Sequence, residues 1–184
     1  MQKQALVVIA NGSEDIETIT ITDILDRAGI AVTLASVQEQ IITTSHGLKI
    51  TAHTVLEECM DIKYDLLAMP GGMTGAKNLR DSALLRKKIR QQIENDRIYA
   101  AICASPQVVL NEQGLLGNKK ATAYPGLTSG FANQTAVNER VVVDGNCITS
   151  QGPGTAIDFA LTCVEQLLSK AKAQEVAKGL LVEW

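Results

Sequence analysis

Residues 98–106 spell IYAAICASP: five apolar residues, a cysteine, two small residues and a proline. The apolar run is typical of a buried strand. Pro106 suits the first turn of a helix, where its missing N–H leaves no hydrogen bond unmade. The stretch therefore predicts a strand that turns sharply into a helix, with Cys103 at the turn.

Apolar runs alternate with helical patterns on either side of this turn. The pattern predicts a mainly parallel, doubly wound α/β sheet with helices on both faces. The 184 residues fit one domain, 1–184, without a linker or an internal repeat. We expect strands at 5–10, 31–36, 64–69 and 98–102, a hairpin at 141–149, and helices at 14–28, 82–94, from about 105, 155–168 and 170–179.

Composition narrows the classes of function. The net charge is -3 and aromatic residues make up 3%, so neither a basic face nor an RNA-type aromatic motif stands out, and we expect no nucleic-acid partner. The apolar run at 5–10 is too short for a membrane span or a signal peptide, which predicts a cytoplasmic protein. Aliphatic residues must build the core.

The four cysteines, Cys59, Cys103, Cys147 and Cys163, form no CxxC pair and no zinc-ligand spacing. The default interpretation of each is a small buried residue. Only the context of Cys103 indicates a reactive cysteine, because its small neighbours permit the tight strand-to-helix turn of a nucleophile elbow. A thiol at a helix N-terminus has its pKa lowered from ~8.5 into roughly the 3.5–7.5 range, so we expect a reactive thiolate. The alternative is a buried cysteine that ends a strand.

Glu17 falls on the inward side of the first expected helix, four residues before Ile21. A carboxylate there is costly unless it is paired or protonated, which makes it a functional candidate. The alternative is a first-turn glutamate that complements the helix dipole. We expect Glu14 and Asp15 to fill that role on the exposed side.

Gly71-Gly72 follows the strand at 64–69 and resembles a backbone nest whose N–H groups face an oxyanion, although a plain tight turn is the alternative. The only histidines, His46 and His53, both precede Cys103. A Cys-His hydrolase needs a histidine base, and either residue has to fold back to supply one. Exposed surface histidines are the simpler interpretation, and their small number argues against a metal centre.

Four segments together carry a family resemblance: NGSEDIET at 11–18, PGG at 70–72 followed by GA at 75–76, AAICA at 100–104, and TSQGPGT at 149–155. The chain resembles the ThiJ/PfpI superfamily, in the branch of DJ-one and its YajL-like bacterial relatives, over essentially its whole length. The resemblance implies a flavodoxin-like fold, a homodimer and no cofactor. It also implies a nucleophilic, easily oxidised Cys103, with protonated Glu17 as its hydrogen-bond partner and the N–H groups of Gly72 and Ala104 at an oxyanion pocket.

The chain departs from the family at two positions. Tyr124 stands where many relatives have a histidine, and a tyrosine is a poor base near neutral pH. His46 stands where some relatives have an anion-binding arginine at the dimer interface, while Arg27 matches a second such arginine. Tyr124 is a candidate for substrate binding, as are Gly71 and Asn11.

Family members are credited with several activities: glyoxalase activity without glutathione, deglycation of methylglyoxal adducts, redox sensing and chaperone activity. The leading hypothesis for this chain is an enzyme acting on small reactive carbonyls or on glycated amines and thiols, in defence against carbonyl and oxidative stress. The alternative is a redox sensor or redox-regulated chaperone that works through oxidation of Cys103. A peptidase or amidase, and a role in thiamine biosynthesis, are weaker hypotheses.

Overall fold

Seven strands form one sheet in the order β5-β2-β1-β6-β7-β9-β8. The computed structural model describes residues 2–184. All neighbouring strands are parallel except the pair β8 and β9. The central order matches the flavodoxin-like doubly wound sheet, so the predicted fold class is confirmed. The strands are β1 (Gln4–Ile9), β2 (Ala31–Ser36), β5 (Thr54–Val55), β6 (Leu66–Met69), β7 (Ile98–Ile102), β8 (Val141–Asp144) and β9 (Cys147–Ser150).

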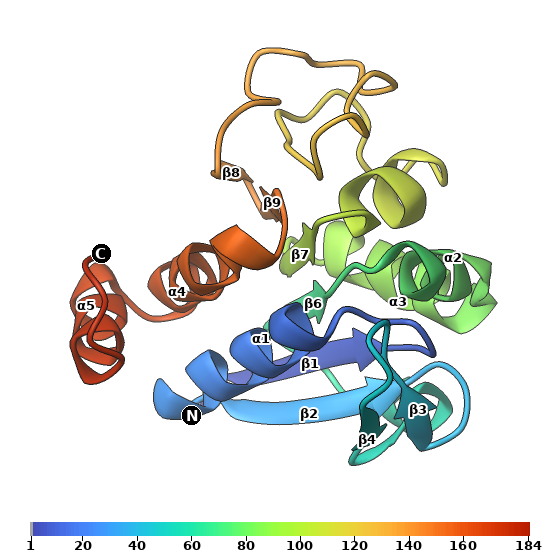
Figure 1. Ribbon diagram of the computed structural model, residues 1–184, viewed down its shortest axis with the longest axis horizontal. Helices are drawn as coiled ribbons and strands as arrows, with labels where there is room; N and C mark the ends of the chain where they lie inside the picture. The colour runs from blue at the N-terminus through green and yellow to red at the C-terminus, as the bar shows by residue number, and fades with distance from the viewer. Residues whose placement is uncertain (1) are drawn as a thin grey trace.

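Helices cover both faces of the sheet (Figure 1). One face carries α1 (Asp15–Arg27), which packs on α4 (Ala156–Leu167), and α4 in turn packs on α5 (Lys170–Gly179). The other face carries α2 (Met73–Asp81), α3 (Ala83–Glu94) and the short helix η2 (Pro106–Asn111). No helix in residues 2–184 is long and apolar enough to cross a membrane.

The core is aliphatic, as the composition predicts. Residues Ala5 to Ile9 of β1 are fully buried, because a central parallel strand is covered by helices on both faces. Only Tyr64, Tyr99 and Phe159 supply large aromatic side chains with less than about 2% exposure. The sheet is therefore a rigid support for the loops that leave its carboxyl edge.

Among the strands and α-helices, four were not predicted: β3 (Ile41–Thr43) and β4 (Lys49–Thr51), which form a hairpin, the strand β5, and the helix α2. Strands of two or three residues are too short to show an alternating pattern. Helix α2 contains Gly75, whose Cα packs so closely on the chain that a Cβ would lie 2.6 Å from Ser13. Tertiary contact outweighs the poor helix propensity of glycine there.

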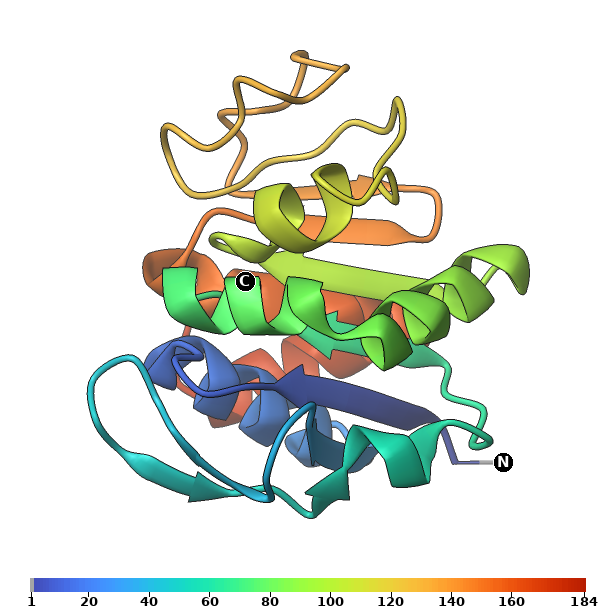
Figure 2. The same ribbon diagram turned by 90° about the vertical axis from the view of Figure 1, so that its right-hand side faces the viewer.

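The hairpin and a long loop lie at the rim of the molecule. The hairpin is anchored next to the start of α1, because Gly12 N donates to Thr43 O at 2.8 Å and Ser45 N donates to Ser13 O at 2.9 Å. Residues 112–140 contain neither a helix nor a strand and form the yellow and orange loops at the top of Figure 2. Two further short helical turns are η1 (Leu56–Cys59) and η3 (Pro153–Thr155).

Candidate active site

The loops after β1, β6, β7 and β9 meet at the carboxyl edge of the sheet. These four strands are direct neighbours in the sheet, so the segments that follow them emerge side by side. Backbone hydrogen bonds join the loops: Glu14 N donates to Gly71 O at 3.0 Å, and Cys103 N donates to Ser150 O at 3.0 Å. In doubly wound sheets, ligands bind at this edge, where the strand order reverses.

Cys103 occupies a strained turn between β7 and η2. Its φ of 65° lies in the left-handed region, which costs a residue other than glycine about 1–3 kcal/mol. Hydrogen bonds on both sides hold it there, since its N–H donates to Ser150 O and its carbonyl accepts from Tyr124 N at 2.8 Å. The side chain keeps access to the surface, as the residue is 8% exposed. This geometry is that of a nucleophile elbow.

Glu17 lies in the first turn of α1 and is fully buried. Its Oε2 accepts a hydrogen bond from Gly71 N at 2.6 Å. Its Oε1 meets no partner with full hydrogen-bond geometry, yet the Cys103 thiol is close enough to affect the Glu17 carboxyl through hydrogen bonding. Burial raises the pKa of Glu17 to about 7, and the negative charge of Glu14 adds to the increase, against the hydrogen bonds from Gly71 and Cys103.

The pKa of Cys103 moves in the opposite direction to the one predicted from the helix dipole. Burial is the main cause that raises it to about 12, followed by the charge of Glu17. Hydrogen bonds from the N–H groups of Gly72 and Ala104 act in the other direction. Helix η2 has only six residues and begins at Pro106, three positions beyond the sulfur, so its dipole is weak. Because the pKa of Glu17 is about 7 and that of Cys103 is about 12, the Glu17 carboxyl group is the first of the two to lose its proton, near pH 7.

The glycine loop divides its two N–H groups between the acid and the thiol. Gly71 N–H binds Glu17, whereas Gly72 N–H, together with Ala104 N–H, reaches the sulfur of Cys103. Gly72 has a φ of 79°, and a Cβ there would lie 2.3 Å from Gly12 O. The loop therefore needs glycine at this position for both its conformation and its close packing. Gly71 holds the Glu17 carboxyl group in place. The prediction that Gly71 binds the substrate rests only on its position beside the site.

Tyr124 borders the open side of the site. Its ring lies beside Gly152, where an added Cβ would be 3.4 Å from Tyr124 Cδ2 and 4.0 Å from Glu17 Oε1. A hollow of about 210 Å³ adjoins Tyr124 and is lined by Pro125, Arg140, Gln151, Gly152, Pro153, Gly154 and Thr155. Sequence reasoning missed Gly152 as a site residue, although its segment was one of the family marks. A Cβ at Gly152 would therefore be in van der Waals contact with both Tyr124 and Glu17.

Asn11 has a structural role in its loop. Its Oδ1 accepts a hydrogen bond from Thr43 N at 2.8 Å, and its backbone oxygen accepts one from Asn78 Nδ2 at 2.8 Å. These bonds attach the end of β1 to the hairpin and to α2. The proposed part of Asn11 in substrate binding stays a prediction without a contact that supports it.

Arg27 and His46 lie at opposite ends of α1. Arg27 Nε pairs with Asp23 Oδ2 at 2.6 Å in the last turn, and His46 Nδ1 lies 3.0 Å from Asp15 Oδ2 at the first turn. Within one chain they do not form a joint anion site. The expectation that Glu14 and Asp15 are exposed is wrong, because the turn before β4 covers both residues and leaves them 6% and 7% exposed.

Neither histidine supplies a base to Cys103. The groups that shift the pKa of the thiol are Glu17 and two backbone N–H groups. His53 is exposed and accepts a hydrogen bond from Leu34 N at its Nδ1, 3.1 Å away, and His46 is bound to Asp15. The expectation of surface histidines is confirmed, and Glu17 is left as the acid–base group nearest the sulfur.

Comparison with known proteins agrees with this geometry. The chain is 41% identical to Arabidopsis thaliana protein DJ-1 homolog B over 98% of its length, but it spans only 42% of that relative. It is 41% identical to Drosophila melanogaster protein dj-1beta with 100% coverage of both chains. It is 30% identical to the Caenorhabditis elegans glutathione-independent glyoxalase DJR-1.2, covering 97% of this chain and 96% of the relative.

Solved structures show the same fold. Oxidised Toxoplasma gondii DJ-1 superposes with a TM-score of 0.96 at 40% identity, covering 99% of this chain and 100% of the other. Drosophila melanogaster DJ-1beta gives 0.94 at 40% identity with full coverage of both. The model of the DJ-1/PfpI family matches residues 3–166, which include Glu17, Gly72 and Cys103. The chain therefore belongs to the DJ-1/PfpI family.

Proposed function

We propose that the protein is a cofactor-free enzyme that converts small 2-oxoaldehydes such as methylglyoxal into 2-hydroxy acids, or removes them from glycated amines and thiols. The observation that carries the proposal is Glu17 Oε1, a fully buried carboxylate oxygen without a full hydrogen-bond partner, next to the thiol of Cys103. An acid–base group with a pKa near the working pH, beside a nucleophile, suits chemistry that moves protons.

In the first step, the sulfur of Cys103 adds to the aldehyde carbon and forms a hemithioacetal. Glu17 as the carboxylate takes the thiol proton, so the high pKa of the thiol does not prevent attack. The N–H groups of Gly72 and Ala104, which already reach the sulfur, stabilise the oxygen that gains negative charge. Glu17 then returns this proton to the oxygen, which completes the hemithioacetal and leaves Glu17 as the carboxylate again.

In the second step, Glu17 moves a proton between the two carbons. It takes the proton from the former aldehyde carbon and returns it to the former ketone carbon, while the hydroxyl proton passes from the first oxygen to the second. The product is a thioester of the 2-hydroxy acid. Water cleaves the thioester and restores the thiol. One carbon is oxidised and its neighbour is reduced, so methylglyoxal plus water gives lactate without an external oxidant, reductant or cofactor.

The family supports this substrate class. One relative at 30% identity is named a glutathione-independent glyoxalase, and it aligns over 97% of this chain. Tyr124 is 50% exposed and lies beside Gly152, so its hydroxyl group can donate a hydrogen bond to a substrate oxygen.

Turnover of methylglyoxal to lactate by the purified protein tests the proposal. Cys103→Ser should abolish turnover, and Glu17→Gln should lower kcat/KM by about 10²- to 10⁴-fold, because it removes the acid–base group. Glu94→Gln, on the exposed face of α3, is the matched control and should keep full turnover. Equal turnover by the wild type and Cys103→Ser would contradict the proposal.

A redox-sensing function, coupled to stress defence or chaperone activity, is the second candidate. It is favoured by the solved relative described as oxidised Toxoplasma gondii DJ-1, which is 40% identical. Protonated Glu17 and the two N–H groups at Cys103 would stabilise a sulfinate by hydrogen bonding. The four free thiols suit a reducing cytoplasm. A sensor would lack lactate production and would instead gain two oxygen atoms at Cys103 under mild peroxide.

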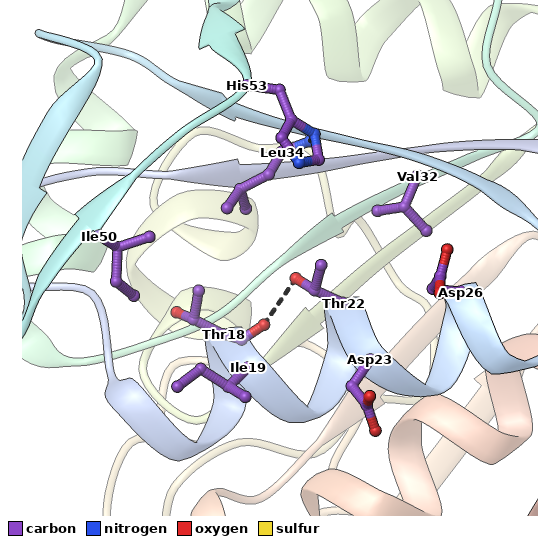
Figure 3. A pocket seen from close by; sticks show the side chains of 9 residues that line it. All are labelled: Thr18, Ile19, Thr22, Asp23, Asp26, Val32, Leu34, Ile50 and His53. Atoms are coloured by element: carbon purple, nitrogen blue, oxygen red, sulfur yellow. Dashed lines mark hydrogen bonds between the residues drawn. The ribbon is translucent and has the colours of Figure 1, made fainter.

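We also propose a homodimer that uses the outer face of α1. An apolar hollow of about 420 Å³ separates α1 from β2 and β4, and its side chains are seen in Figure 3. Ile16 and Ile19, on the same helix, are 56% and 53% exposed. Apolar groups exposed together on one helix are typical of a protein–protein interface. Light scattering at micromolar concentration should give the mass of two chains, and Ile19→Lys should give the mass of one.

A further inference from the structure

A polar hollow of about 240 Å³ lies at the edge of the sheet opposite Cys103. Arg97, which lines it, directly precedes the first residue of β7, whereas Cys103 directly follows the last residue of the same strand. The charged side chains that line the hollow are Asp61, Lys63, Lys88 and Arg97. Sites for drug-sized ligands have volumes of about 300–1,000 Å³, so this hollow suits a smaller molecule.

Arg97 lacks the anionic partner that its side chain is suited to bind. It is half-buried, yet within residues 2–184 its guanidinium group makes no ion pair and no hydrogen bond. The carboxylate of the adjacent Asp65 is already bound, by Lys3 Nζ at 3.1 Å and by Gln4 N at 2.9 Å. A guanidinium group has five N–H donors and can bind two oxygens of a phosphate group in parallel. Three other arginines do pair with carboxylates: Arg27, Arg80 and Arg140.

Lys88 adds a buried positive charge to the same hollow. The residue is only 4% exposed, and its Nζ donates to three backbone oxygens, those of Cys59 at 3.0 Å, Met60 at 2.9 Å and Ile62 at 2.6 Å. All three N–H groups are therefore in use, so Lys88 contributes charge and no hydrogen bond. Burial lowers the pKa of Lys88, and the positive charge of Arg97 acts in the same direction. An anion in the hollow would offset the repulsion between the two cations.

We propose that this hollow binds a phosphate dianion, either free or carried by a small metabolite. Two N–H groups of Arg97 bind two phosphate oxygens, and the exposed Lys63 approaches the anion from the rim. Lys88 contributes its charge. Within residues 2–184, Asp61 is the only carboxylate that lines the hollow, and it is exposed and forms no ion pair with any of the three cations. The excess of positive charge favours a doubly charged phosphate over a singly charged carboxylate.

The outer face of α3 extends the positive charge beyond the hollow. Arg86, Lys87 and Arg90 are exposed there, and within residues 2–184 none of them forms an ion pair. They line a second hollow of about 300 Å³, which shares Gln91 with the first. The net charge of the whole chain is -3, so this face differs in sign from the molecule as a whole. Charges of one sign gathered on one face attract anions towards it.

The arginine side chains allow a direct test by NMR, because each Nε–H group gives its own signal in a ¹⁵N-labelled protein. The protein is titrated with inorganic phosphate, glycerol 1-phosphate or glycerol at constant ionic strength. We expect either phosphate to shift the Arg97 signal and to saturate it at one ligand per chain. Arg140, which is paired with Asp158, is the internal control and should stay in place, and glycerol should move neither signal. Tighter binding of glycerol 1-phosphate would identify an organic phosphate as the ligand, and equal binding would identify free phosphate.

Variants identify the groups that hold the phosphate. Arg97→Gln should weaken binding about tenfold or more in calorimetry, because it removes the charged pair of donors. Arg86→Gln is the matched control: it removes an unpaired arginine of α3 that does not line the hollow, and its affinity should stay within about twofold of the parent. Both variants should unfold at the temperature of the parent. Equal shifts at all arginines, an absence of saturation, or unchanged affinity in Arg97→Gln would each overturn the proposal.

Discussion

Replacing Glu17 by glutamine should change how the stability of the protein depends on pH. Glutamine has the shape of the protonated carboxyl group: its oxygen can accept the Gly71 N–H, as Oε2 does at 2.6 Å, and its NH₂ can donate towards Cys103. It differs by never becoming charged. The variant therefore isolates the free energy of burying a negative charge at this position.

The structure gives the magnitude and the sign. Burial raises the pKa of Glu17 from 4.5 to about 7, which corresponds to about 3 kcal/mol between the two protonation states. Because the native pKa is the higher one, the folded chain binds this proton more tightly than the unfolded chain. The stabilisation is fully present below about pH 4.5 and is lost as the pH rises through about 7.

Urea unfolding of the wild type and Glu17→Gln from pH 5 to pH 8 measures this effect. Relative to the wild type, the free energy of unfolding of the variant should rise by about 2.5 kcal/mol between pH 5 and pH 8. Glu94→Gln, on the exposed face of α3, is the control and should show no such trend. A difference that stays flat with pH, or that reverses, would refute a buried, proton-binding Glu17.

Three further outcomes follow from the same site. The kcat/KM for methylglyoxal should rise with pH through about 7, as Glu17 becomes the carboxylate base, and Glu17→Gln should abolish that rise; a profile that falls through the same range would contradict the assigned base. Under mild peroxide, Cys103 should be oxidised before Cys147 and Cys163, because it is 8% exposed and they are at most 1% exposed. Peptide mass mapping measures the order of oxidation, and the reverse order would contradict the assignment of Cys103 as the reactive thiol. Tyr124→Phe should retain kcat within a few-fold, because its phenol is a donor and not a base; a loss as large as that of Glu17→Gln would show that the proton path runs through Tyr124.

Much of the site was visible in the sequence, because short segments carry it. The apolar run that ends at Cys103, and the proline three residues later, predicted the turn between β7 and η2 that the structure contains. Helical periodicity placed Glu17 on the buried face of α1, where it lies. These are local properties of neighbouring residues, and local patterns report them well.

Periodicity failed where distant parts of the chain come together. It assigned Glu14 and Asp15 to the exposed side of the first helix, yet they are 6% and 7% exposed. The turn at residues 44–46 belongs to a hairpin of two three-residue strands, too short to be recognised, and it folds over the start of α1. The contact between His46 and Asp15 therefore could not be foreseen from either segment alone.

The sequence by itself determined the order of the central strands β1, β2, β6 and β7, the buried acid and the cysteine turn, because apolar spacing and turn residues act within a few positions. The tertiary structure alone decided the protonation states. Burial among four converging loops raises the pKa of Glu17 to about 7 and that of Cys103 to about 12, against the influence of the adjacent helix. Removal of water from a charged group depends on everything packed around it, and that packing exists only once residues far apart in the chain have met.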